Sequence, residues 1–136
     1  MRLEITRRAD LATRALLALA QDRERTKASV LAERVGTTPG FLSQAMTPLV
    51  ARGWVRSEPG PSGGYTAVVD PSKVSVLEII EAVEGRTDTG RCVLEDRPCS
   101  GDTACVLHGP WSIARDQLLG ELAATPLSTL TDRRSS

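Results

Sequence analysis

Aromatic side chains are scarce in this chain, whose 136 residues include only two Trp, one Tyr and one Phe. The core must therefore be filled by aliphatic side chains, which the hydrophobic fraction of 40% can supply. No stretch approaches the roughly 20 apolar residues of a transmembrane helix, and the N-terminus lacks the apolar core of a signal peptide. We therefore expect a cytoplasmic protein that makes no membrane contact.

Positive charge is not in excess either, because 17 basic residues balance 17 acidic ones. A chain that binds DNA usually needs a basic surface, since neutralising phosphates provides much of the affinity. The basic residues are unevenly distributed, however: residues 1–56 contain ten of them against five acidic residues. We therefore expect any DNA contact to come from the N-terminal half.

Cysteine and histidine are equally rare, and all of them fall within one short segment. Cys92, Cys99, Cys105 and His108 follow the spacing C-x6-C-x5-C-x2-H, and no other Cys or His occurs. An odd number of cysteines in a cytosolic protein disfavours structural disulfides. The segment is rich in charged residues, Gly and Pro, so the thiols have little core to fill. Thiolates with an imidazole suit an iron–sulfur cluster or zinc, although zinc knuckles of the C-x2-4-C type are absent.

The first half of the chain has three helical patterns. Apolar residues recur at helical spacing over residues 6–21. A short second helix follows, with Thr26 as its predicted N-cap and Gly36 just after its end. The third begins with Thr38 as N-cap and Pro39 at its first position. Two short helices joined by a tight turn are typical of a helix-turn-helix.

The third helix has an apolar inner stripe and an opposite stripe of small and polar side chains. Pro48 lies inside it, and proline in a helix interior costs on the order of 3 kcal/mol. We therefore expect the helix to kink or end early, which leaves residues 39–47 to read DNA. The inner stripe consists of Leu42, Ala45, Met46 and Leu49, and the opposite stripe of Gly40, Ser43, Gln44 and Thr47.

A β-hairpin is predicted directly after the third helix, in the place of the wing of a winged helix. Residues 54–57 and 65–69 have strand composition, and the residues between them are rich in Pro and Gly. A capping box begun by Ser75 then opens a helix to about Val83.

A last helix is predicted from Thr103 or Pro110 to about Ala124. It has an apolar stripe that the winged helix does not need, so we expect it to pair with a second copy. The predicted fold is thus mainly α with a small β-hairpin wing: a winged helix-turn-helix plus a long C-terminal dimerisation helix. Residues 1–70 form the DNA-binding domain, residues 71–130 the linker helix, cysteine loop and dimerisation helix, and residues 131–136 a tail. The stripe consists of Trp111, Ala114, Leu118 and Leu122, and we expect Trp111 and Tyr65 to be core residues.

These features together resemble the IscR/NsrR family of bacterial winged-helix regulators over roughly residues 1–130. The order of wing, helix, three-cysteine loop and final helix is the most specific part. The resemblance also rests on Met1-Arg2-Leu3, Ala9-Asp10-Leu11-Ala12, Gly60-Pro61-Ser62-Gly63-Gly64-Tyr65, Val76-Leu77-Glu78-Ile79-Ile80-Glu81-Ala82-Val83-Glu84-Gly85 and the cysteine loop.

The resemblance implies a homodimer that binds palindromic, double-stranded promoter DNA and carries a [2Fe–2S] or [4Fe–4S] cluster on three cysteines and a fourth ligand. His108 is the favoured fourth ligand, because IscR-like proteins use a His there and because Cys105-x2-His108 places both side chains on one side of a helical turn. Asp10 of the partner subunit is the alternative, as in NsrR-like proteins. With His108 as ligand, [2Fe–2S] is favoured over [4Fe–4S].

Two departures from the family concern the wing and the cysteine loop. Many relatives have in the wing an Arg that reaches DNA, where this chain has Pro59 preceded by Glu58. The first two cysteines are separated by six residues, where IscR-like proteins often have five.

The predicted function is a transcription regulator whose promoter binding responds to an iron–sulfur cluster through cluster supply, nitric oxide or redox state. A cluster-free thiol-redox or zinc-binding regulator on the same scaffold is one alternative, and an iron–sulfur carrier is another. No nucleophile–base pair is present, so we do not expect an enzyme. The residues predicted to contact DNA are Thr38, Gly40, Phe41, Ser43, Gln44, Thr47 and Gly60.

Overall fold

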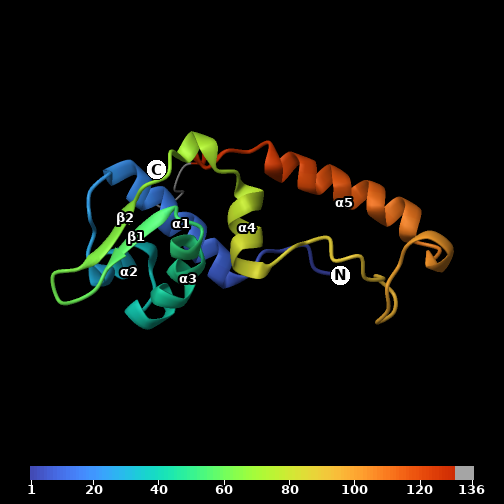
Figure 1. The fold of residues 1–136 in the computed structure, drawn as a ribbon, viewed down its shortest axis with the longest axis horizontal. Coiled ribbons are helices and arrows are strands. Elements are labelled where there is room, and N and C mark those ends of the chain that lie inside the picture. Colours follow the sequence, from blue (N-terminus) through green and yellow to red (C-terminus); the bar gives the residue numbers. More distant parts are fainter. Residues whose placement is uncertain (131–136) are drawn as a thin grey trace.

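The computed structural model describes residues 1–130, so the predicted tail at residues 131–136 lies outside the described part. The order of elements is α1 (Arg7–Asp22), α2 (Ala28–Val35), α3 (Pro39–Ala51), β1 (Val55–Glu58), β2 (Gly64–Ala67), η1 (Pro71–Lys73), α4 (Val76–Glu84), η2 (Gly101–Thr103), α5 (His108–Ala123) and η3 (Leu127–Thr129). Helices α1 to α4 and the hairpin form an N-terminal body, from which α5 extends (Figure 1). The predicted fold class, a mainly helical winged helix-turn-helix followed by a long helix, is confirmed.

Local capping signals set most helix starts. The Thr6 hydroxyl accepts a hydrogen bond from the N–H of Ala9, and the Thr38 hydroxyl does the same for Phe41. Ser75 and Glu78 form the predicted capping box of α4. Each cap satisfies a backbone N–H that has no partner within its own helix, so these helices begin close to their predicted positions.

The core of the N-terminal body is aliphatic, as the scarcity of aromatics requires. Phe41, Trp54 and Tyr65 pack against its edge without being fully buried, so Tyr65 belongs to the margin of the core. Its largest fully buried side chains are Leu11, Leu16, Leu19, Leu31, Leu42, Met46, Leu49, Val74, Ile79 and Leu127.

Thr26 is not the N-cap of α2, which starts after Lys27 without a side-chain cap. The N–H and C=O of Thr26 instead pair with the backbone of Tyr65, at 2.9 Å each, and hold Thr26 extended against β2. This close approach requires Gly64, because a Cβ at that position would lie 2.1 Å from the Thr26 carbonyl oxygen. The capping prediction was therefore wrong because a long-range strand pairing competes with the local cap.

Pro48 does not end α3, which continues to Ala51. The prediction of an early end was wrong because proline removes only the one backbone hydrogen bond that its own N–H would make. The carbonyl of Pro48 still accepts the N–H of Arg52, at 3.1 Å, and Leu49 lies fully buried one residue later. Burial of the last turn therefore outweighs the lost bond.

Helix α5 starts at His108, between the two predicted starts, because residues 101–103 form a separate 3-10 turn. None of its residues is buried, and Ile113 and Leu118 are exposed by 74% and 44%. Trp111 is half-buried and lies outside the core, so its assignment to the core was wrong. Within residues 1–130, no helix combines the length and the apolar character needed to cross a bilayer.

The chain returns to the N-terminal body after α5. The N–H of Leu127 donates to the carbonyl of Val74 at 2.8 Å, Ser75 pairs with Pro126, and the Leu127 side chain is fully buried. Both ends of the extension formed by residues 85–124 are therefore anchored in the same core.

We predict that Leu127→Ala lowers the free energy of unfolding by about 2–5 kcal/mol, because it removes a fully buried side chain from the core. Val30→Ala, at a side chain that is 46% exposed, is the control and should change it by less than about 0.5 kcal/mol. Urea unfolding followed by circular dichroism measures both. Equal stability of the two variants would show that the returning segment does not contribute to the core.

Candidate metal centre

The six residues between Cys92 and Cys99 fold into a small hairpin. Arg91 and Pro98 form an isolated antiparallel bridge. The N–H of Cys92 donates to the carbonyl of Arg97 at 2.8 Å, and the N–H of Cys99 donates to the carbonyl of Gly90 at 2.9 Å. This pairing places the first two cysteines side by side, and the longer gap is accommodated in the hairpin turn.

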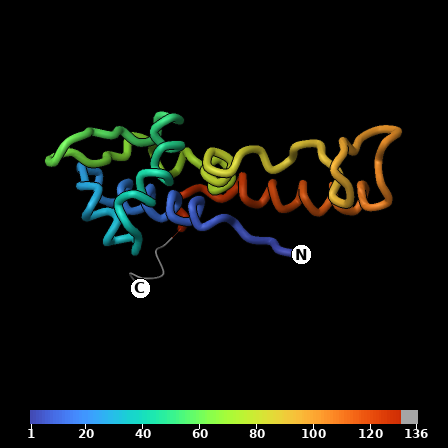
Figure 2. The backbone as a smooth tube through the Cα atoms, turned by 90° about the horizontal axis from the view of Figure 1, so that it is seen from below, coloured from blue at the N-terminus to red at the C-terminus, as the bar shows by residue number. Residues whose placement is uncertain are grey.

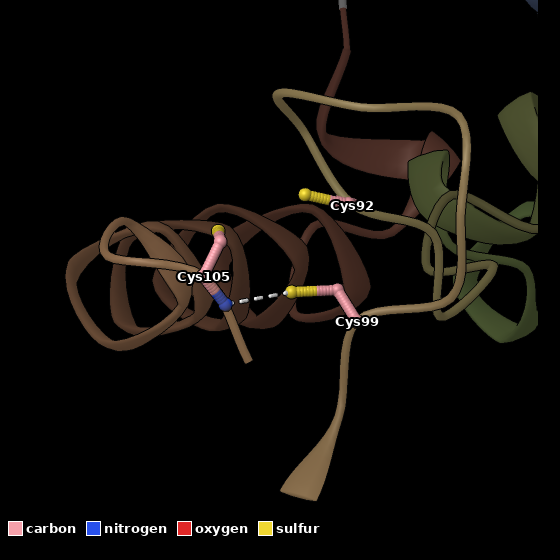
Figure 3. Close-up of side chains that lie close together, drawn as sticks. All are labelled: Cys92, Cys99 and Cys105. Atoms are coloured by element: carbon pink, nitrogen blue, oxygen red, sulfur yellow. Dashed lines mark hydrogen bonds between the residues drawn. The ribbon is translucent and has the colours of Figure 1, made fainter. Parts of the chain in front are cut away.

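A 3-10 turn brings the third cysteine back to the hairpin. The Thr103 hydroxyl donates to the Ser100 carbonyl at 2.7 Å and accepts the Ser100 N–H at 3.2 Å. The N–H of Cys105 then donates to the Sγ of Cys99 at 3.3 Å (Figure 3). The Sγ atoms of Cys92, Cys99 and Cys105 all lie within 4.8 Å of one another. Cys99 is buried, the other two are half-buried, and all three are free thiols.

The surroundings of the sulfurs affect their ionisation in opposite directions. The N–H of Leu94, 3.4 Å from the Sγ of Cys92, lowers the pKa of Cys92 because it stabilises the thiolate. Loss of solvent contact raises the pKa of Cys105. Arg97 lies close to this group: hydrogen bonding to Glu95, and then the charges of Cys92 and Cys99, raise its pKa.

The imidazole of His108 lies beside one of the three thiols, that of Cys99. Its Nδ1 lies 3.4 Å from the Sγ of Cys99, and the residue opens α5 immediately after the cysteine loop. Asp10 lies on α1, where its carboxylate is 3.1 Å from the guanidinium of Arg14. Arg14 also donates to the carbonyl of Val35 at 2.8 Å. Within one chain, therefore, His108 contacts Cys99 and Asp10 is paired with Arg14.

The donor set fits a soft metal. Thiolates bound at about 2.3 Å to one tetrahedral ion lie a little under 4 Å apart, so small adjustments would bring these sulfurs onto a metal or onto the irons of a cluster. The N–H groups of Leu94 and Cys105, which point at sulfur, would stabilise the negative charge of such a site. Three free thiols this close could also exchange with disulfides.

The residues predicted to contact DNA lie in two places, the start and outer face of α3 and the wing tip. Gly40, Ser43, Gln44 and Thr47 are exposed on α3. Ser43 and Thr47 line a hollow that α3 shares with Ser57 and Tyr65 of the hairpin. The remaining three also have structural roles: Thr38 caps α3, Phe41 packs against the core, and Gly60 turns the wing with φ 98°.

Sequence reasoning missed two arginines that organise these regions. The guanidinium of Arg7 lies 5.6 Å from the ring centre of Phe41 and thus connects α1 with α3. Arg97 hydrogen bonds across the cysteine loop. In the sequence, neither arginine can be told apart from the other basic residues, because both roles depend on contacts that form only in the folded chain.

Residues 5–133 match the family model of Rrf2, described as an iron-dependent transcriptional regulator. The chain belongs to the Rrf2 family. The chain is 33% identical over 104 residues to the HTH-type transcriptional regulator IscR of Photorhabdus laumondii. The aligned residues make up 76% of this chain and 63% of that protein. IscR of Escherichia coli O1:K1 is 34% identical over 104 residues, and this alignment covers 76% of this chain and 64% of that protein. The match thus spans slightly less than two thirds of these relatives.

Solved structures agree on the fold. CymR of B. subtilis superposes with a TM-score of 0.76 at 24% identity, covering 96% of this chain and all of that one. T. potens IscR superposes with a TM-score of 0.69 at 21% identity, and the superposition covers 98% of this chain and 96% of that one. The predicted resemblance to IscR-like proteins is confirmed, and membership of a family of transcriptional regulators agrees with the prediction that the chain is not an enzyme.

Proposed function

We propose that this Rrf2-family protein is a cytoplasmic, homodimeric regulator whose binding to promoter DNA responds to an iron–sulfur cluster. The observation that carries the proposal is the convergence of three thiols within 4.8 Å of one another, one of them in contact with His108, in a chain that also contains a winged helix. When bound, a cluster supplies a centre whose oxidation state and integrity can change. An iron–sulfur carrier would have no use for the winged helix.

Cys92, Cys99 and Cys105 would hold the cluster, with His108 as fourth ligand. The 3.4 Å separation of His108 from Cys99 supports this ligand, whereas Asp10 of the same chain pairs with Arg14. We therefore favour [2Fe–2S] over [4Fe–4S]. A relative named IscR, 34% identical, is consistent with an iron–sulfur protein but leaves the cluster type open.

Residues 1–70 would form the DNA-binding domain, with α3 in the major groove. The exposed stripe of Gly40, Ser43, Gln44 and Thr47 would approach base edges and phosphates. Residues 71–130 would form the sensing and dimerisation part. Helix α5 buries none of its residues within the described chain, which supports pairing with a second copy. A two-fold dimer would read a palindrome, because the protein and its DNA site then share their symmetry.

A pair of reciprocal contacts connects the two parts. Arg8, in the first turn of α1, donates to the carbonyl of Val83 near the end of α4 at 2.7 Å. Glu84, the last residue of α4, accepts the N–H of Thr6 at 3.2 Å. The cysteine loop begins just after Glu84, and the residue between Thr6 and Arg8 is the Arg7 that stacks on Phe41 of α3. A change in the loop could therefore reach the recognition helix through α1.

A cluster-free thiol or zinc regulator is the second candidate, because three free cysteines this close could react with one another or share a zinc ion. An absorbance spectrum with iron and sulfide analysis of anaerobically purified protein separates the candidates. Visible absorbance with stoichiometric iron and sulfide supports the cluster, and a colourless protein without iron supports the second candidate.

We predict that His108→Ala alters the cluster and Asp10→Ala leaves it intact, because the imidazole and not the carboxylate lies at the cysteines. Mössbauer or resonance Raman spectra of the two anaerobic variants provide the measurement, with circular dichroism as the check on folding. A cluster perturbed by Asp10→Ala and unaffected by His108→Ala would instead assign the fourth ligand to Asp10 of the partner.

We predict that Gln44→Ala relaxes base choice at one position in each half-site by roughly 1–3 kcal/mol, provided that the amide pairs with an adenine edge. The control is Gln21→Ala, an exposed glutamine at the end of α1. Selection of binding sites from random duplexes, followed by anisotropy titration, gives the discrimination. Identical preferences for wild type and Gln44→Ala would mean that Gln44 faces solvent in the complex.

A further inference from the structure

We propose that Arg97 is the positioning residue of the three-cysteine site. Its side chain joins the hairpin that carries Cys92 and Cys99 to the segment that carries Cys105, and it places a positive charge in the loop of the three thiolates. This inference rests on the proposed metal-binding role of the cysteines. It assigns a function to a residue that is itself no ligand.

The contacts of Arg97 span both arms of the loop. Its Nε lies 2.6 Å from the carboxylate of Glu95, within the hairpin turn. Its Nη1 donates to the carbonyl of Pro98 at 3.1 Å and to the carbonyl of Thr103 at 2.5 Å, two residues before Cys105. The backbone carbonyl of the same residue accepts the N–H of Cys92 at 2.8 Å. One residue thus contacts the segments that carry all three thiols.

Charge gives Arg97 a second role. Residues 86–105 contain four acidic and three basic residues, and three bound thiolates add further negative charge. Arg115 is paired with Asp88 at 3.4 Å, and Arg91 is paired with Asp96, whose side chain is 99% exposed. The side chain of Arg97 is 35% exposed, against 47% for Arg91, and its hydrogen bonds to the carbonyls of Pro98 and Thr103 hold its positive charge within the loop that carries the three sulfurs. A positive charge held in this place favours the thiolate form of metal-bound cysteines.

The fork of the guanidinium matters as well as its charge. Lysine would keep the positive charge but could not donate to Glu95, Pro98 and Thr103 in this fixed planar arrangement. Arg97→Lys should therefore keep the electrostatic effect and lose the link between the arms, whereas Arg97→Gln loses both.

The first test titrates metal-free protein anaerobically with Co²⁺ alone and follows the thiolate–cobalt absorption. Arg97→Gln should weaken cobalt binding about 10- to 100-fold, the usual cost of removing a residue that orients metal ligands, and Arg97→Lys should give an intermediate loss. The matched control is Arg91→Gln, which removes an exposed ion pair from the same hairpin and should stay within about threefold of wild type.

The second test measures the midpoint potential of reconstituted cluster protein. Losing a nearby positive charge stabilises the oxidised state, so the potential should fall in Arg97→Gln and stay near the wild-type value in Arg97→Lys. Circular dichroism confirms folding, and Arg97→Lys keeps the test valid should Arg97→Gln unfold.

Three results would contradict the proposed role of Arg97 or the metal centre on which it rests. If the wild type binds no cobalt, the metal centre itself is wrong. If the wild type binds cobalt and Arg97→Gln binds it equally well, or no worse than Arg91→Gln, the positioning role of Arg97 is overturned. A potential that falls as far in Arg97→Lys as in Arg97→Gln would overturn its role as counter-charge.

Discussion

The backbone pairing between residues 90–92 and 97–99 is the constraint on which the candidate site depends. Without this pairing, nothing in the six residues between Cys92 and Cys99 would hold the two thiols close together. With it, the 3-10 turn at Gly101–Thr103 needs only to bring Cys105 and His108 back to a preformed pair. The loop is thus a small, internally hydrogen-bonded unit, which reduces the entropy that metal binding must overcome.

The second constraint is that this unit lies away from the surface proposed to contact DNA, while both of its ends are joined to the N-terminal body that carries this surface (Figure 1). In both views the chain leaves α4, runs outward to the cysteine loop and returns through α5 (Figure 1; Figure 2). The outgoing end is joined to α1 by Arg8 and Glu84, and the returning end is anchored by buried Leu127. An extension held in this way can pass a change in its loop to the core instead of absorbing it.

Features that depend on neighbours in sequence were predictable, and features that depend on distant contacts were not. The caps of Thr38 and Ser75 fixed two helix starts, and rarity alone identified the four candidate ligands. Thr26 was misassigned because its pairing with Tyr65 is a long-range contact. Nor did spacing reveal the hairpin between the cysteines or the reach of Arg97 to Thr103, since these depend on how the loop closes on itself.

If the state of the cysteine site controls DNA affinity, as we propose, removing the cluster must change the dissociation constant for DNA. A duplex selected by the cluster-bearing protein is titrated anaerobically with that protein before and after the cluster is removed by a chelator, alongside a scrambled duplex. We predict that removal changes the dissociation constant for the selected duplex by roughly 5- to 150-fold and leaves the dissociation constant for the scrambled duplex largely unaffected. Equal dissociation constants for the two forms on the selected duplex would contradict it.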